Sequence, residues 1–212
     1  MYLPEHFAET RLEELDRIIR EHPLGMLVTH TASGLDANHL PFELDADRGA
    51  FGTLQAHVAR TNPLCREVAD GAAVLVVFRG AQGYISPNWY PSKHETHRHV
   101  PTWNYEVVHA QGRIRLIDDA KFVGSLVAQL TRRHEATEPR PWKMADAPRD
   151  YIEQMLRMVV GIEIELTSLT GKRKLGQNRD ARDVQGVISA LQERGQHDLS
   201  SAMARANLKK TG

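Results

Sequence analysis

The sequence predicts a protein of the α+β class, built round a small antiparallel β-barrel of about six or seven strands. From Gly25 the chain alternates strand-like segments with turn sequences in meander order: GMLVTH, TASG, LDANHLPFEL, DADRG and AFGTLQA. Helical patterns lie between and after the strands, without the strand–helix–strand alternation that builds a parallel sheet. No GxGxxG follows a strand and no GxxxxGK[ST] occurs, so a Rossmann or P-loop nucleotide site is not supported.

The first half of the chain is predicted to begin with a helix from about Thr10 to Glu21. Thr10 and Glu13 have the spacing of a capping box, and the apolar residues Leu12, Leu15, Ile18 and Ile19 recur at helical spacing. After the meander, HVARTNPLCREVADG is expected to hold a short helix before Gly71, and AAVLVVFRG and GYIS are predicted strands. The segment 87–101 contains three prolines and is predicted to be a loop.

The second half is predicted to contain two long strands and three helices. TWNYEVVHAQGRIRLI is a long strand in which Gly112 is a candidate bulge, and alternating residues from Ile162 to Leu166 predict another strand in VGIEIELTSLTGKRKL. Asp118 and Asp119 can cap a helix, a second helix is expected from about 148 to 158, and a third from 180 to 194. The tail after 194 is expected to be weakly helical at best.

Composition favours one domain over residues 1–212, with a helical C-terminal extension from about residue 180. Hydrophobic residues make up 41% of the chain, enough to bury a sizeable core, and no composition break divides it. The 27 basic and 27 acidic residues balance, which argues against a dedicated nucleic-acid binder although DNA remains a conceivable partner. The single cysteine, Cys65, and the absence of an apolar leader or span predict a cytoplasmic protein that does not enter a membrane.

Aromatic and polar side chains are concentrated between residues 84 and 105. Five of the thirteen aromatic residues lie there, namely Tyr84, Trp89, Tyr90, Trp103 and Tyr105, beside hydroxyl and amide groups. Aromatic rings next to such groups suit a flat heteroaromatic ligand, because rings supply stacking area while polar groups bind the ligand edge. A barrel rim sealed by aromatic residues explains the same pattern equally well.

The stretches YISPNWYPSK, VPTWNY and KLGQNR resemble the signature stretches of the PaiB-type family of FMN-binding negative transcriptional regulators. MYLPEHF and QAHVARTNP match the same pattern, so the resemblance extends from about residue 1 to 190. It implies a split β-barrel related to pyridoxamine-phosphate oxidase, with appended helices, formed as a homodimer with FMN at the interface. It leaves the enzymatic role open, with a flavin-dependent oxidoreductase as one possibility and no catalytic residue identified.

The resemblance also implies cofactor-binding residues, position by position. The strand end that could meet the isoalloxazine edge with its backbone contains Asn38, His39, Leu40 and Pro41, and the segment at the phosphate or ribityl end contains Arg60 and Asn62. The implied pocket wall consists of Ser86, Trp89, Thr102, Trp103 and Asn104. The residues implied to approach from the C-terminal segment are Lys174, Gln177, Asn178 and Arg179. A lysine and an arginine can neutralise a phosphate dianion. Two features depart from the family pattern: Gly176, where a serine is common, and the insert HETHRH.

Haem is the alternative cofactor, since some split-barrel relatives bind haem and His57 lies at a predicted strand end beside Arg60. Without a CxxCH motif such a site would be non-covalent. His94, His97 and His99 lack the spacing of HExxH and are predicted to lie in a solvated loop rather than to bind a metal. The basic run GKRK is better explained by the phosphate of a cofactor than by DNA.

Overall fold

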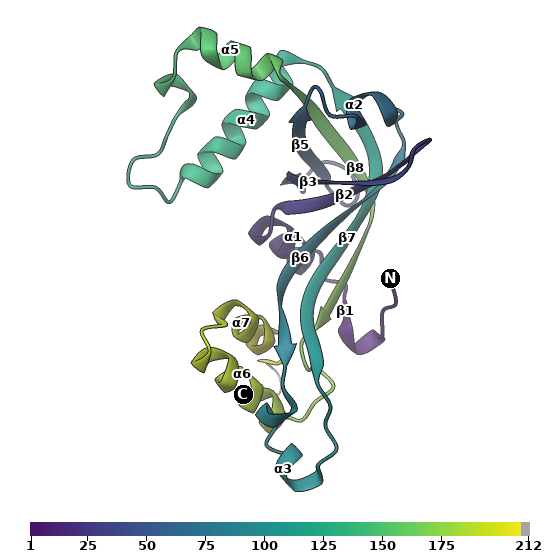
Figure 1. Cartoon of the computed structure of the whole chain (residues 1–212), viewed down its shortest axis with the longest axis vertical. Coiled ribbons are helices and arrows are strands. Elements are labelled where there is room, and N and C mark those ends of the chain that lie inside the picture. Colours follow the sequence, from purple (N-terminus) through teal and green to yellow (C-terminus); the bar gives the residue numbers. More distant parts are fainter. Residues whose placement is uncertain (209–212) are drawn as a thin grey trace. The chain divides into compact units, whose positions relative to one another are not determined.

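The structure, a computed structural model, describes residues 1–208 and contains eight strands hydrogen-bonded into one antiparallel sheet (Figure 1). Its order is β3-β2-β6-β7-β8-β5-β4, with β1 paired to β8. The strands are β1 (Ala8–Glu9), β2 (Leu24–Thr31), β3 (Gly34–Pro41), β4 (Glu43–Asp45), β5 (Thr53–Ala59), β6 (Ala73–Ile85), β7 (Thr102–Ile117) and β8 (Val159–Lys174). Because β3 and β4 end the order without pairing to each other, the barrel is open, and the predicted α+β split barrel is confirmed.

Helices lie between and after these strands, as the sequence predicts. They are α1 (Leu12–Glu21), α2 (Leu64–Glu67), α3 (Lys93–Thr96), α4 (Ala120–Glu135), α5 (Arg149–Arg157), α6 (Ala181–Glu193) and α7 (His197–Ala206). None of the helices in residues 1–208 combines the length and the apolar composition needed to cross a bilayer.

The contacts within the chain divide it into two compact units. Unit 1 contains residues 1–22, 79–108 and the described residues from 170 onward, and unit 2 contains residues 23–78 and 109–169. The strands β6, β7 and β8 each contribute residues to both units.

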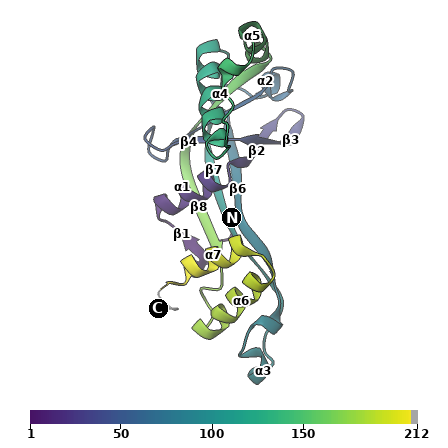
Figure 2. The same ribbon diagram turned by 90° about the vertical axis from the view of Figure 1, so that its left-hand side faces the viewer.

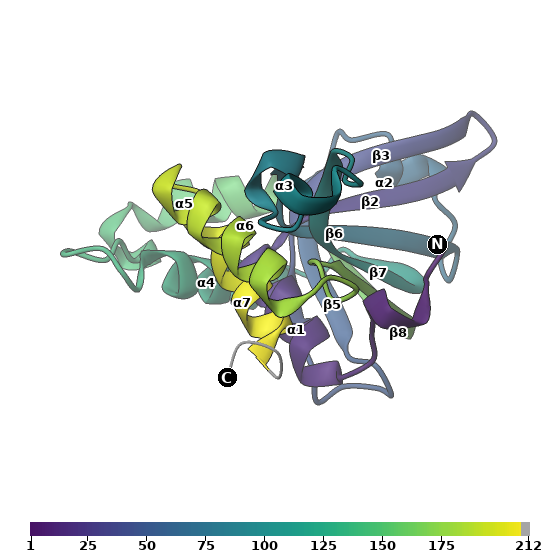
Figure 3. The ribbon, with the colours of Figure 1, turned by 90° about the horizontal axis from the view of Figure 1, so that it is seen from below.

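Unit 2 is organised round the hairpin of β2 and β3, which lie side by side with Leu24 opposite Pro41 and Thr31 opposite Gly34 (Figure 3). The inward side chains of its strands are fully buried, among them Leu27, Leu54, Phe78 and Ile162. The helices α4 and α5 lie against each other, and α4 also contacts β5 (Figure 1). Asp119 begins α4 by accepting a hydrogen bond from the Phe122 N–H at 2.7 Å, which confirms it as the cap.

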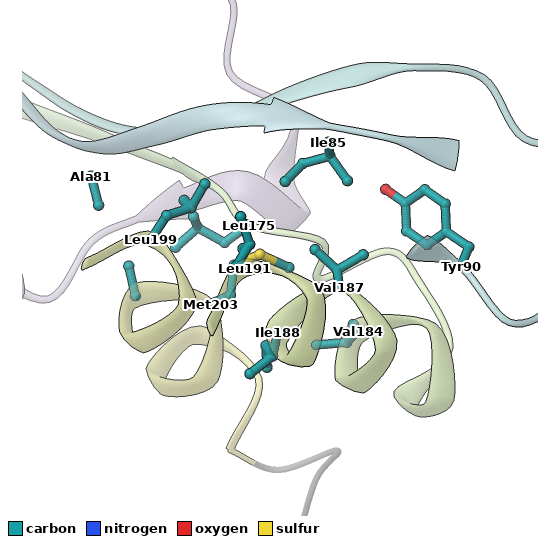
Figure 4. Close-up of a cluster of buried hydrophobic side chains, with 11 residues drawn as sticks. Ala81, Ile85, Tyr90, Leu175, Val184, Val187, Ile188, Leu191, Leu199 and Met203 are labelled. Atoms are coloured by element: carbon teal, nitrogen blue, oxygen red, sulfur yellow. The ribbon is translucent and has the colours of Figure 1, made fainter. Parts of the chain in front are cut away.

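Unit 1 is organised round the neighbouring helices α6 and α7 (Figure 2). Their apolar faces bury a cluster that includes Ala81 and Ile85 of β6 (Figure 4), with Tyr90, Leu175, Val184, Val187, Ile188, Leu191, Leu199, Ala202 and Met203. Gly83 of β6 lies so close to α7 that an added Cβ would be 2.8 Å from Leu199 Cδ2. Any other residue at this position would therefore require the Leu199 side chain to shift.

Four local predictions need correction. Thr10 does not cap α1, since the N-cap is Arg11 and no side-chain cap bond forms. LDANHLPFEL is divided at Phe42 between β3 and β4, and the segment 87–101 contains a 3-10 turn and the short helix α3. The tail after 194 forms α7, because its apolar residues Leu199, Ala202 and Met203 are covered by the cluster of unit 1.

Gly112 lies within the continuous strand β7, at a position where the backbones of β7 and β8 approach each other closely. An added Cβ would lie 2.5 Å from the backbone oxygen of Glu165 on β8, which no other residue can accommodate without a backbone shift.

A network of buried charges links the N-terminal segment of unit 1 to β7 and β8. Arg173, which is 3% exposed, donates from Nε to Glu106 Oε1 at 2.8 Å and from Nη1 to Glu9 Oε2 at 3.2 Å. Arg17 also donates to Glu106 Oε1 at 3.2 Å, and Arg11 forms two bonds to the Glu9 carboxylate at 2.9 and 2.7 Å. Each buried carboxylate therefore has at least two cationic donors.

Glu9 is expected to make the protein sensitive to acid. Burial alone would raise the pKa of this carboxyl, but hydrogen bonds from Arg11 and Arg173 outweigh burial and lower its pKa from 4.5 to about 2. The stabilisation is present above pH 4.5 and is lost as the pH falls toward 2; it amounts to about 3 kcal/mol. Urea unfolding at pH 7, 4 and 3 should show Glu9→Gln losing less stability on acidification than the wild type, whereas the exposed Glu5→Gln control should follow the wild type. Parallel pH profiles of wild type and Glu9→Gln would contradict this.

Candidate functional site

The predicted residues Thr102, Trp103 and Lys174 lie together in unit 1, where β7 and β8 run side by side. Lys174 Nζ donates to the Trp103 carbonyl at 3.0 Å and to the Thr102 hydroxyl at 2.5 Å. Burial, together with the positive charges of Lys172 and Arg179, lowers the pKa of Lys174. An anion bound beside Lys174 would offset both effects.

Lys172 lies on the same face of β8 as Lys174, because side chains two residues apart on a strand point the same way. Its ammonium donates to the Tyr2 carbonyl at 3.0 Å and lies 5.5 Å from the ring centroid of Tyr2 and 5.6 Å from that of Tyr105. Within residues 1–208, no carboxylate lies within 4.0 Å of either lysine ammonium. This face therefore combines two uncompensated cations with aromatic rings. We call it the lysine face.

Arg179 is held by the insert that departs from the family pattern. Its guanidinium lies 5.3 Å from the ring centroid of Tyr90, and its Nη1 lies 3.4 Å from His99 Nδ1. The His99 ring stacks on Tyr90 with centroids 4.9 Å apart. His94 and His97 are exposed as expected of a solvated loop, but the His99 side chain is only 10% exposed, so the prediction does not hold for that residue.

Ser92, His99 and Asp183 form a buried polar cluster that fastens the segment 87–101 to α6. Ser92 donates to Asp183 from its hydroxyl at 2.6 Å and from its backbone N–H at 3.0 Å, and His99 Nε2 lies 2.7 Å from the Ser92 hydroxyl. The hydroxyl proton is directed at the carboxylate rather than at the imidazole, so this is not the arrangement of a nucleophilic serine activated by histidine. Burial would raise the pKa of Asp183, but the bonds from Ser92 outweigh it and lower that pKa.

Asp183→Ala is expected to loosen this attachment and to destabilise the protein by about 1.5–3 kcal/mol, the usual contribution of hydrogen bonds to a charged group. The Ser92 N–H would lose its buried acceptor, and limited trypsin digestion should then cleave the segment 87–101 faster at Lys93 and Arg98. Asp180→Ala is the matched control, since Asp180 begins the same helix but makes no side-chain cap bond. Equal cleavage rates in the two variants would contradict a fastening role.

The remaining predicted residues of unit 1 are engaged in local structure. The Ser86 hydroxyl accepts from the Asn88 N–H at 3.2 Å, and the Trp89 ring centroid lies 4.9 Å from the Arg194 guanidinium. Asn104 is 3% exposed, and its amide nitrogen lies 3.4 Å from the Met203 sulfur.

The turn after β8 contains the other two predicted residues. Gln177 accepts from the Leu175 N–H at 2.8 Å and donates to the Arg173 carbonyl at 2.6 Å, while Asn178 is exposed. Gly176 has φ +86°, in the left-handed region. The departure from the family's serine is therefore accounted for by backbone conformation.

A cavity of about 650 Å³ in unit 1 is lined by the half-exposed rings of Tyr84 and Trp103. Gly80 and Gly83 of β6 line it too, together with His22 and residues 195–199 at the start of α7. Aromatic rings beside a glycine-rich backbone offer a stacking surface for a planar group.

In unit 2, the structure brings Asn38 and Asn62 together. The Asn62 amide donates to Asn38 Oδ1 at 2.8 Å, and the Asn38 amide donates to Asp36 at 2.9 Å. The other predicted residues of β3 are His39, which is exposed, and Leu40 and Pro41, which are partly buried.

Arg60 is occupied by other partners. Its guanidinium forms a bidentate pair with Asp118 at 2.7 and 2.6 Å and donates to the Arg157 carbonyl at 2.8 Å. This pair lines a cavity of about 480 Å³ beside the start of α4 and the end of α5. A phosphate that bound Arg60 would have to compete with the Asp118 carboxylate.

His57 lies on β5 opposite Gly161 and is partly buried. Burial lowers its pKa, so the ring is neutral near pH 7, and its Nδ1 has no hydrogen-bond partner among the described residues.

Sequence reasoning missed Lys172, His99, Ser92 and Asp183. The spacing of the two lysines in GKRK was a usable signal for Lys172, because alternate residues of a strand share a face. No sequence signal connects Ser92 with Asp183, which are 91 residues apart.

Comparison with solved structures identifies the class. The flavocytochrome Anf3 from Azotobacter vinelandii superimposes with a TM-score of 0.58 at 13% identity, covering 82% of this chain and 73% of that one. The FAD and heme binding protein from Mycobacterium smegmatis superimposes with a TM-score of 0.56 at 20% identity, covering 80% of this chain and 74% of that one. At these identities the likeness concerns the fold, which is that of the split barrels.

The family follows from the sequence comparisons. The family model described as "Putative FMN-binding domain" matches residues 1–168. The Bacillus subtilis protein named "Protease synthase and sporulation protein PAI 2" is 30% identical over 192 residues, covering 91% of this chain and 89% of the relative. The chain therefore belongs to the PaiB-type family of FMN-binding domains, as its signature stretches predict, and FMN is the cofactor that this membership supports.

Proposed function

We propose that the protein binds FMN as a homodimer, with the flavin between two copies and its phosphate on the lysine face. The observation that carries this proposal is the pair Lys172 and Lys174, two cations without a carboxylate partner among the described residues, beside the Thr102 hydroxyl and the Tyr105 ring. A phosphate dianion supplies the missing negative charge, and charge-assisted hydrogen bonds of this kind are about twice as strong as neutral ones.

FMN, when bound, supplies hydride and electron transfer. The residues of this chain contribute binding and orientation. Lys172 and Lys174 neutralise the phosphate, Thr102 donates or accepts a hydrogen bond, and the Trp103 ring, half exposed, offers a stacking surface. Arg60, Asn62 and the residues Asn38 to Pro41 remain proposed contacts of the cofactor, and Arg60 would first have to release Asp118.

Two roles are compatible with flavin binding, a negative transcriptional regulator and a flavin-dependent redox protein. The relative named for protease synthesis and sporulation supports a regulatory role, while the split-barrel neighbours named for flavin and haem support redox chemistry. A gel-shift titration with upstream DNA separates them, since a regulator must show salt-sensitive binding.

The test of the proposed function is a titration of the purified full-length protein with FMN, followed by quenching of flavin fluorescence, together with the mass in solution. We expect one FMN per chain and the mass of a dimer. Protein that neither carries flavin as isolated nor quenches added FMN, or that remains monomeric with FMN bound, would refute the proposal.

Haem is the second candidate, favoured by the neutral, partly buried His57 with its unpartnered Nδ1. A Soret band on haem titration that disappears in His57→Ala would establish it, and the absence of a Soret band would remove it.

A further inference from the structure

A second cavity in unit 1, of about 560 Å³, lies where the N-terminal segment around β1 meets the C-terminal end of α7. Three arginines line it, Arg11, Arg173 and Arg205, and Glu9 is the one carboxylate among the described residues of its wall. Glu14 and Glu106 pair with Arg173 from outside the lining of the cavity.

Both oxygens of the Glu9 carboxylate are occupied by arginines of the wall. Arg11 bonds both of them, at 2.9 and 2.7 Å, and Arg173 bonds one at 3.2 Å. Arg11 and Arg173 are therefore charge-paired, and Arg205 supplies the positive charge of the wall that no carboxylate of the described residues balances.

Arg173 has one nitrogen left over. Its Nε is used by Glu106 and its Nη1 by Glu9 and Glu14, but Nη2 is buried and has no acceptor among the described residues. The residue is 3% exposed, so bulk water does not supply the missing acceptor. A buried N–H group without an acceptor is costly, and an oxygen atom placed in the cavity would remove that cost.

Arg205, in the last turn of α7, supplies a further cation to the cavity wall, from a different element than Arg173. The residue is exposed and forms no ion pair within the described chain. A planar guanidinium presents two parallel donors, which match the oxygens of a phosphate or carboxylate group.

The cavity is separate from the lysine face. Arg173 and Lys174 are successive residues of β8, and successive side chains of a strand point to opposite faces. An anion held by Arg173 therefore does not occupy the position proposed for the FMN phosphate.

We propose that this cavity binds a small-molecule anion through a phosphate or carboxylate group, held by Arg173, Arg11 and Arg205. Its volume accommodates a small metabolite rather than a polymer, and its donors recognise the oxyanion.

Isothermal titration calorimetry tests the proposal with inorganic phosphate and, in a second arm, with succinate, which distinguishes a phosphate site from a carboxylate site. The full-length protein is used both saturated with FMN and as the variant Lys174→Met, so that the lysine face cannot account for the signal whether or not FMN binds. We expect one anion per chain, about tenfold weaker binding in Arg205→Gln, and a larger loss in Arg11→Gln/Arg205→Gln.

Arg149→Gln is the matched control, since it removes the same charge from an arginine of unit 2 that does not line the cavity, and it should bind like the wild type. Arg205→Lys keeps the positive charge but loses the two parallel N–H donors of the guanidinium. It replaces Arg205→Gln if that variant does not fold. Binding of neither anion at tens of millimolar, or equal binding by the wild type and the double variant, would overturn the proposal.

Discussion

Glu106→Ala is expected to lower the free energy of unfolding by about 3–5 kcal/mol, the usual cost of removing one partner from a buried ion pair. Glu106 is 1% exposed and accepts from both Arg173 and Arg17 through the same oxygen. Removing it leaves the Arg173 guanidinium buried with two of its nitrogens lacking an acceptor among the described residues. Urea unfolding at pH 7, monitored by circular dichroism, measures the loss.

The exposed Glu13→Ala provides the control, because it removes a carboxylate from the first turn of α1 without touching the buried network. It should change stability by no more than about 0.5 kcal/mol. If Glu106→Ala and Glu13→Ala unfold at the same urea concentration, the buried charge network does not contribute the stability expected of it.

Lys174→Glu is expected to weaken FMN binding by about 100-fold. The substitution removes a charge-assisted hydrogen bond to the proposed phosphate and places a second negative charge beside it. Quenching of FMN fluorescence measures the dissociation constant, and the thermal unfolding midpoint shows whether the fold is preserved.

Lys121→Glu makes the same charge change on the exposed surface of α4 and should leave FMN affinity unchanged. A Lys174→Glu protein that folds and binds FMN as tightly as Lys121→Glu would exclude the lysine face as the phosphate site.

The elements that the sequence predicts correctly are those with a strong period. The alternation from Ile162 to Leu166 predicts β8, and Asp119 marks the start of α4 because its side chain caps the helix. The helix α7 could not be predicted in this way. Its apolar face is small, and Leu199 and Met203 gain their burial from residues of β6 and α6 that are distant in sequence.

The residues of the candidate site also differ in how far the sequence could predict them. Resemblance to the family points to Lys174 and Thr102, which the structure brings together. It cannot reveal that Arg60 is paired with Asp118, 58 residues away, or that Asn104 points at Met203. Such contacts depend on which strands become neighbours, and a single sequence does not encode that in any local pattern.

The division into two units has a consequence for experiments on fragments. Two of the boundaries of unit 1 fall inside β6 and β7, and a third falls inside β8. No uninterrupted piece of the polypeptide therefore encodes either unit, and a truncated chain that stops before Thr170 would lack α6 and α7 and leave Ala81 and Ile85 without their cover. Fragments of this kind should aggregate, so activity and binding are best mapped by point substitutions in the intact chain.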